Sequence, residues 1–205
     1  MQATETTQKS KKDLILEAAE QLLGEAGYEA LSARAVAERA GVNKALVFYH
    51  WGSTSALFEA VLVRYYERHK ASLEDAFDQP GTPRERMHRV VDDYLDFMES
   101  EQTYARIVQQ QVSSGGEHVP LVRAHLSSVL EITKRMMKGV TPEKGPLSAR
   151  HFHLSLSALV INYFTYSPML VPEGSDYDPF TDEALAERRS HVHWVVDTWL
   201  DALAA

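Results

Sequence analysis

The segment from residue 31 to residue 58 restricts the fold more than any other part of the chain, because it holds two short helical patterns separated by a tight turn. Ser32 suits the start of the first helix, since its hydroxyl can accept a hydrogen bond from an open backbone amide. Val36, Ala37 and Ala40 then fall on one face at helical spacing. Gly41 stands where this helix must end and where a residue that tolerates positive φ is needed.

The second pattern begins at Asn43, which also suits a helix start, and Leu46, Val47 and His50 repeat after it at helical spacing. Val42 and Val47 supply apolar contacts between the two helices. Together these features predict a helix-turn-helix, whose second helix enters the major groove of DNA. Two short helices joined at a glycine also occur in helical proteins that do not bind DNA, so spacing alone leaves both interpretations open.

The run AGVNKALVFYHWGSTSALFEAVL resembles the N-terminal domain of TetR-family transcriptional regulators. Members of that family show A-G-V, a short recognition helix, an aromatic run, a loop containing Ser, and a fourth helix that starts with L-F or L-L. The matching residues are Ala40, Gly41, Val42, Lys44, Val47, Phe48, Tyr49, His50, Trp51, Ser53, Leu57 and Phe58. The resemblance is specific over about residues 10–70 and general beyond them.

The composition excludes several classes of protein. The chain of 205 residues has no Cys, which excludes disulfides, thiolate metal sites and thiol nucleophiles. No apolar run has the length of a membrane span, and the N-terminus lacks the apolar core of a signal peptide, so we expect a cytoplasmic protein without membrane contact. The net charge of −8 argues against a simple basic DNA binder, but residues 1–70 hold 9 Lys+Arg and 9 Asp+Glu and are neutral. DNA contact needs only a local basic face.

The helical patterns predict an all-α fold of about nine helices without a convincing strand. We expect a disordered tail over residues 1–9, a DNA-binding domain over 10–70 with its helix-turn-helix at about 32–51, and a C-terminal domain over 71–205. The stretch 147–166 is apolar nearly all round, which predicts a helix buried on several sides.

The resemblance implies which residues meet DNA. The predicted contacts are Ser32, Arg34, Asn43, Lys44, Ala45, Leu46, Tyr49, His50 and Thr54. Lys44 lies near the start of the recognition helix, where a long polar side chain reaches base edges. Phe48 and Trp51 are expected in the core. Many family members carry basic residues where this chain has Gly52 and Thr54, so its phosphate affinity is expected to be lower, or to be restored by lysines near the N-terminus.

The resemblance also assigns ligand binding to the C-terminal domain. The candidate wall of an apolar pocket consists of Tyr94, Phe97, Met98, Tyr104, Val108, Gln111, Leu126, Leu130, Tyr163 and Phe164. Met and aromatic side chains can line an adaptable pocket. Plain core packing explains each of these residues equally well.

Two long apolar helices near the C-terminus predict a homodimer. The candidate interface residues are Leu156, Leu159, Val160, Val192, Val195, Trp199 and Leu203. Paired with their symmetry mates, the two helices would form a four-helix bundle and present two recognition helices to a pseudo-palindromic DNA operator. The alternative is that these stripes only complete the core of the protomer.

Metal, cofactor and enzyme signatures are lacking. The pairs His151/His153 and His191/His193 are spaced i, i+2 and point to different faces of a helix, so no metal site and no cofactor are expected. The chain has no glycine-rich phosphate loop, no H-E-x-x-H and no nucleophile elbow. We therefore expect a transcriptional repressor that an unidentified small apolar or aromatic effector releases from DNA, rather than an enzyme. A small all-α enzyme and an effector-independent DNA-binding protein are the alternatives.

Overall fold

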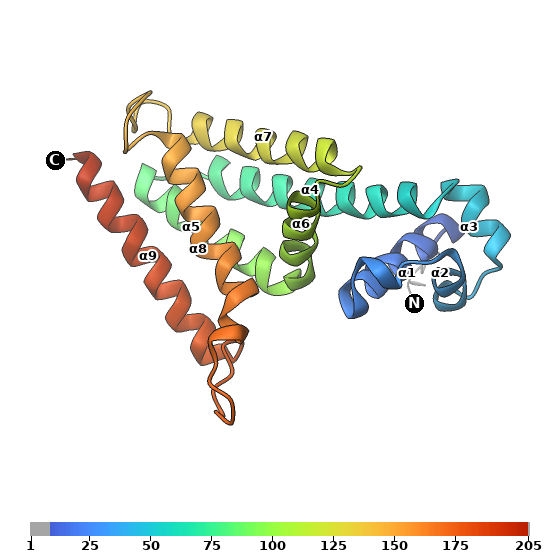
Figure 1. Ribbon diagram of the computed structural model, residues 1–205. Coiled ribbons are helices and arrows are strands. Elements are labelled where there is room, and N and C mark those ends of the chain that lie inside the picture. Colours follow the sequence, from blue (N-terminus) through green and yellow to red (C-terminus); the bar gives the residue numbers. More distant parts are fainter. Residues whose placement is uncertain (1–8, 205) are drawn as a thin grey trace, which may run out of the picture. The chain divides into compact units, whose positions relative to one another are not determined.

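All regular structure in the described residues, 9–204, is helical in the computed structural model (Figure 1). Nine α-helices and two short 3-10 helices account for it, and no strand occurs in this range. The predicted all-α fold is confirmed. The tail predicted over residues 1–9 lies outside the described residues except for Lys9.

The chain divides into two compact units, and the boundary falls between Tyr65 and Tyr66, inside one long helix. The elements of the first unit are α1 (Lys11–Ala26), the 3-10 helix η1 (Tyr28–Ala30), α2 (Ala33–Ala40), α3 (Lys44–Trp51) and the first part of α4 (Thr54–Asp78). Its core is built from side chains that are fully buried: Ile15, Leu23, Val36, Val47, Leu57 and Phe58.

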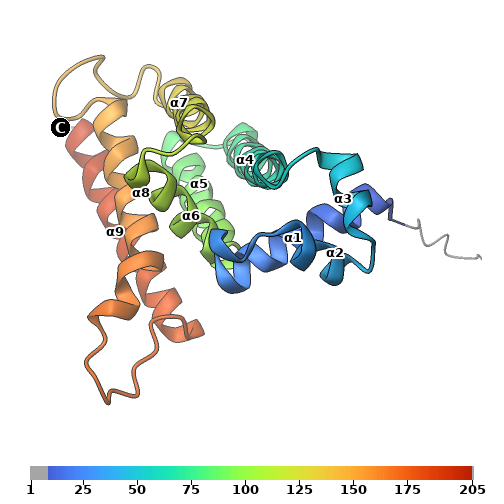
Figure 2. The ribbon, with the colours of Figure 1, turned by 45° about the vertical axis from the view of Figure 1, so that its right-hand side comes forward.

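The second unit contains the rest of α4 and the elements α5 (Pro83–Ser100), α6 (Gln102–Ser114), α7 (Val119–Met136), α8 (Ala149–Tyr166), the 3-10 helix η2 (Ser167–Leu170) and α9 (Asp182–Ala204). Helix α8 contacts α5, α6, α7 and α9, so it is the central element of this unit (Figure 2). Thr82 and Glu85 form a capping box at the start of α5, where Thr82 N donates to Glu85 Oε2 over 2.8 Å.

Helix α8 contacts four helices, in agreement with the predicted burial on several sides, but part of its surface is exposed. Its face with Phe152 and Val160 is buried, whereas Leu154 is 60% exposed and Tyr166 is also exposed. A helix that is apolar all round is buried on all sides only when neighbours cover every face, and no described helix covers Leu154 completely.

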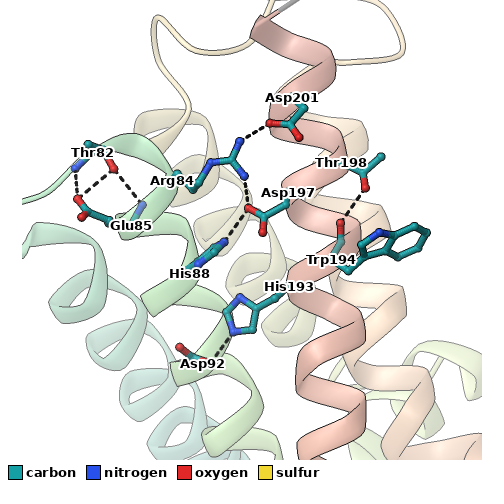
Figure 3. Close-up of polar contacts among 10 residues, drawn as sticks. All are labelled: Thr82, Arg84, Glu85, His88, Asp92, His193, Trp194, Asp197, Thr198 and Asp201. Carbon is teal, nitrogen blue, oxygen red and sulfur yellow. Dashed lines mark hydrogen bonds and ion pairs between the residues drawn. The ribbon is translucent and has the colours of Figure 1, made fainter.

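A row of ion pairs joins α5 to α9 (Figure 3). Arg84 binds Asp197 and Asp201, and His88 Nε2 lies 2.8 Å from Asp197 Oδ1. One turn further along α5, Asp92 contacts both Arg189 and His193 of α9. These contacts fix the register of α9 against α5 at several points.

Within residues 9–204, no single helix is long and apolar enough to cross a membrane; only α3 and α4 together, bent by 63°, satisfy the length and composition criteria.

Candidate nucleic-acid interface and ligand cavity

The helix-turn-helix of the first unit forms for the local reasons that the sequence indicates. Ser32 Oγ accepts from Ala35 N over 3.2 Å at the start of α2. Gly41 ends α2 in the left-handed region at φ 64°, which a glycine adopts without strain. Asn43 Oδ1 then accepts from Leu46 N over 2.8 Å and starts α3. The turn between the two helices is therefore held by caps at both ends.

Helix α3 presents an exposed face with one cation and a large aromatic side chain. Lys44 and Ala45 are exposed, and Tyr49 is 81% exposed, whereas Leu46 and His50 are half-buried. Within the described part of the chain, Lys44 has no carboxylate partner and its Nζ lies over the Phe48 ring, 5.6 Å from the centroid. A free ammonium group at the start of an exposed helix can bond the acceptors of a base edge or a phosphate.

One aromatic prediction for this helix is wrong. Phe48 is 42% exposed and so lies outside the core, because Val47 fills the position that faces α2. Trp51 is half-buried, and Lys12 Nζ lies over its ring, 4.9 Å from the centroid. The exposed surface of α3 therefore includes Phe48 beside Lys44.

The other predicted DNA contacts differ in their exposure and in whether their side chains already have a partner. Arg34 is exposed but pairs with Glu38 one turn along α2, with a distance of 3.0 Å between Nε and Oε1. Thr54 is half-buried in the first turn of α4. Ser53, which the sequence analysis did not name as a contact, caps that turn by accepting from Ala56 N over 3.0 Å. A phosphate would have to compete with Glu38 for Arg34.

A cavity of about 660 Å³ lies within the second unit, among α4, α5, α6, α7 and α8. This volume suits a drug-sized molecule. Its apolar lining comprises Val108, Val112, Val122, Leu126, Leu154 and Ile161. Two exposed cations, Arg123 and Arg150, also line it. The exposed lining residues, which mark the mouth of the cavity, come from α6, α7 and α8, and the buried ones mark its inner end.

The inner end of the cavity is polar. We call His69, Tyr94, Tyr104 and His125 the polar floor, since all four line the cavity and are buried. The Tyr104 hydroxyl lies 3.1 Å from His125 Nε2. Burial lowers the pKa of His69 to about 3, with smaller effects from His125 and His153, and burial lowers the pKa of His125 to about 4. Both imidazoles are therefore neutral at pH 7.

Half of the predicted pocket residues line this cavity. They are Tyr94, Tyr104, Val108, Leu126 and Leu130. The other five predicted residues, Phe97, Met98, Gln111, Tyr163 and Phe164, do not line it. Met98 is fully buried, Phe164 stacks on Phe180, and the Tyr163 hydroxyl donates to Pro179 O over 2.6 Å. They pack against other neighbours, which is the core role that the sequence left open.

Sequence reasoning missed the histidines of the cavity. His69 follows Tyr66 by three residues and precedes Leu73 by four, so it falls on the buried stripe of α4. His125 lies between Val122 and Val129 on α7 in the same way. A histidine inside an apolar stripe was the signal that could have found both.

The predicted dimer residues separate into two groups. Leu156, Val160 and Val192 are buried within the protomer, so they complete its own core and are not exposed for a partner. The second group is half-buried: Leu159, Val195, Trp199 and Leu203. Trp194, which the sequence analysis did not name, is 64% exposed on α9. The buried group shows that the monomer-core alternative holds for three of the seven.

Metal ligation finds no support in the described part of the chain, where no three His, Asp or Glu side chains lie close enough to hold an ion. His153 contacts Thr133 over 3.0 Å between Nδ1 and Oγ1, and His193 Nε2 lies 2.7 Å from Asp92 Oδ1. The two i, i+2 histidine pairs are therefore split between separate surroundings.

Comparisons with known proteins agree with this architecture. Residues 15–61 match the family model "Bacterial regulatory proteins, tetR family". The chain is 27% identical over 160 residues to the probable HTH-type transcriptional regulator YttP of Bacillus subtilis, covering 74% of this chain and 76% of that protein. It is 34% identical over 84 residues to the HTH-type transcriptional repressor KstR of Mycolicibacterium smegmatis, covering 41% of each. The crystal structure of a TetR transcriptional regulator from Legionella pneumophila superposes with a TM-score of 0.72 at 16% identity, over 93% of this chain and 99% of that one.

Proposed function

The chain belongs to the TetR family of transcriptional regulators, and from this premise we propose that it is a repressor released from its DNA operator by a small, mainly apolar effector. TetR-family regulators bind operator DNA, form dimers and are not enzymes. The observation that carries the proposal is the presence, in one chain, of an exposed recognition helix and a cavity large enough for an effector.

In this proposal helix α3 recognises the DNA sequence. Lys44 and Tyr49 carry the main contacts, because both are exposed and Lys44 has no carboxylate partner among residues 9–204. Flanking contacts come from the caps and exposed positions nearby: Ser32, Arg34, Asn43, Ala45, Leu46, His50 and Thr54. Arg34 contributes only when it leaves Glu38, which costs little for an exposed ion pair.

The operator is proposed to be pseudo-palindromic, because a two-fold dimer presents two copies of α3 about 34–36 Å apart, one turn of DNA. The half-buried apolar residues of α8 and α9 supply the dimer surface: Leu159, Val195, Trp199 and Leu203, joined by the exposed Trp194. One recognition helix reads only a few base pairs, so the dimer is needed for specificity.

Effector binding is proposed to act through α4. This helix begins at Thr54, beside the recognition helix in the chain, and its residue His69 lines the cavity. A ligand shifts a conformational equilibrium only by its difference in affinity for the two states. An effector that contacts His69 therefore acts on an element that the DNA-binding unit also contains.

A titration of fluorescently labelled DNA from upstream of the protein's own gene tests the proposal, by anisotropy at one fixed salt concentration. Lys44→Ala should weaken binding at least about fivefold, as the loss of one good base contact costs about 1–3 kcal/mol. Lys138→Ala removes an exposed lysine of the second unit and is the matched control. Equal binding by the parent and Lys44→Ala would contradict the role given to α3.

The effector arm uses the same DNA titration with and without compounds that raise the melting temperature by binding the folded state. Such compounds should weaken DNA binding. If every stabilising compound leaves DNA affinity unchanged, the chain is an effector-independent regulator, and if compounds strengthen binding it is not a repressor of this kind. We also propose that the protein is cytoplasmic.

A further inference from the structure

His69 is the side chain of the cavity whose hydrogen-bonding capacity the protein does not use. It is 4% exposed, and among residues 9–204 neither Nδ1 nor Nε2 has a hydrogen-bond partner. Its ring stacks against Tyr94 and Phe97, with centroids 4.9 Å and 4.8 Å away. Leaving a buried polar group without a partner is costly, so such a group calls for an explanation.

The neighbours of His69 have the same character. The Tyr66 hydroxyl is buried and has no hydrogen-bond partner in the described part of the chain. The Tyr66 ring stacks on His125, with centroids 3.8 Å apart and the planes 6° from parallel. His69 and His125 lie 5.6 Å apart by their ring centroids. Two imidazoles thus face one small region at the inner end of an apolar cavity, and one of them is wholly unsatisfied.

We propose that the polar floor recognises an uncharged hydroxyl or carbonyl group, carried by a mainly apolar effector whose body lies along α6, α7 and α8. The proposal rests on the proposed function, since it names the chemical class of that effector. A neutral imidazole has one N–H donor and one acceptor nitrogen, and a hydroxyl group can satisfy either of them.

The charges around the cavity favour an uncharged group at the floor. Burial keeps both histidines neutral at pH 7, so a carboxylate at the floor would meet no cation unless a histidine took up a proton against its lowered pKa. A charge buried among them without a partner would be strongly disfavoured. The cations that line the cavity, Arg123 and Arg150, are exposed at its mouth, so an anionic ligand would be held there and not at the floor.

Three probes that share one ring system separate these cases: 2-naphthol, 2-methylnaphthalene and 2-naphthoate. Equilibrium dialysis of the full chain at pH 7, with ultraviolet quantification, gives each dissociation constant. The parent should bind 2-naphthol at least about tenfold more tightly than either other probe, because unsatisfied buried partners reject a ligand that lacks the hydroxyl. Tighter binding of 2-naphthoate, or no binding of any probe, would overturn the proposal.

Variants assign the preference to His69. His69→Phe keeps a ring against Tyr94 and Phe97 but removes both nitrogens, so the preference for 2-naphthol over 2-methylnaphthalene should fall at least about fivefold. His69→Gln keeps a donor and an acceptor and should retain part of it, which also covers the case in which the Phe variant fails to fold. His191→Phe makes the same exchange at an exposed site on α9 and should leave the preference unchanged. An unchanged preference in both His69 variants contradicts the proposal.

The DNA titration keeps the two proposals apart. If 2-naphthol binds with the expected preference but leaves DNA affinity unchanged, the effector-release function fails and the site stands. If the three probes bind equally and all release DNA, the function stands and the polar floor has no role in recognition.

Discussion

The buried histidines should make the protein sensitive to mild acid. The pKa of His69 falls from an ordinary value of 6.5 to about 3, and that of His125 to about 4, chiefly because burial disfavours the charged imidazole. The unfolded chain therefore binds protons at a pH where the folded chain does not. Stability must fall as the pH drops below about 6.5, and it continues to fall until the folded pKa is reached.

The magnitude follows from these values. At about pH 5.5 protonation stabilises each unfolded histidine by about 1.4 kcal/mol, compared with about 0.2 kcal/mol at about pH 7, so each contributes a loss of about 1.2 kcal/mol. The two together give about 2.5 kcal/mol, a large fraction of the stability of a typical domain. Most carboxyl groups titrate below this window, so the window isolates the histidines.

Urea unfolding followed by circular dichroism, at both pH values and one protein concentration, measures this loss. His69→Phe should reduce the pH-dependent loss of stability by about 1.2 kcal/mol, while His125 and the half-buried His153, whose pKa burial also lowers, keep their contributions. It should also raise stability at about pH 7, because it removes two unsatisfied nitrogens. The exposed His191→Phe variant should keep the full dependence. A parent protein that is equally stable at both pH values would refute the reasoning, as would a His69→Phe variant with unaltered pH dependence.

Three further predictions address the turn at Gly41, the row of ion pairs between α5 and α9, and the dimer. Gly41→Ala should cost about 1–2 kcal/mol in urea unfolding, because φ is 64° while a Cβ there meets no atom within 4 Å, so the penalty is backbone strain alone. Burial alone would raise the pKa of Asp92, but hydrogen bonds from α9, including that from Arg189, outweigh it and lower the pKa. Asp92→Asn should therefore lower the free energy of unfolding in urea by at most about 1 kcal/mol at about pH 7, because solvent screens this group. The loss should be smaller at a pH below the folded pKa of Asp92, where the carboxylate is protonated in the parent. Charged substitutions at both Val195 and Trp199 should give monomers in light scattering and abolish DNA binding, and a dimer of unchanged affinity would exclude this surface.

The elements of the fold that sequence predicts well are those decided by local chemistry. Ser32 and Asn43 are predictable as helix caps, because a side-chain oxygen at that position can accept a hydrogen bond from the open backbone amide three residues later. Gly41 was identified as a helix end because few other residues tolerate its backbone angle. Each assignment needs only a few neighbouring residues, so the rest of the chain could not alter it.

Which side of a helix is covered depends on distant segments, and here the predictions were less successful. Val160 and Leu159 are adjacent in an apolar stretch, yet Val160 is fully buried and Leu159 is partly exposed. The hydropathy of the two residues is nearly the same. Only the positions of α5, α7 and α9 around α8 separate a core residue from a candidate dimer residue, and periodicity within one helix does not contain that information.

The cavity contains one residue, His69, whose buried position the sequence pattern does indicate. On α4 the apolar residues Tyr65, Tyr66 and Leu73 follow the helical period, and His69 lies between them on the same face. That a polar residue occupies a core position could therefore be deduced from α4 alone. Its neighbours could not, since Tyr94, Phe97 and the other residues around its ring come from later helices. A polar side chain in a buried stripe either has a partner from elsewhere in the chain or has none. Among residues 9–204 His69 has none, and the proposed contact with a ligand rests on that observation.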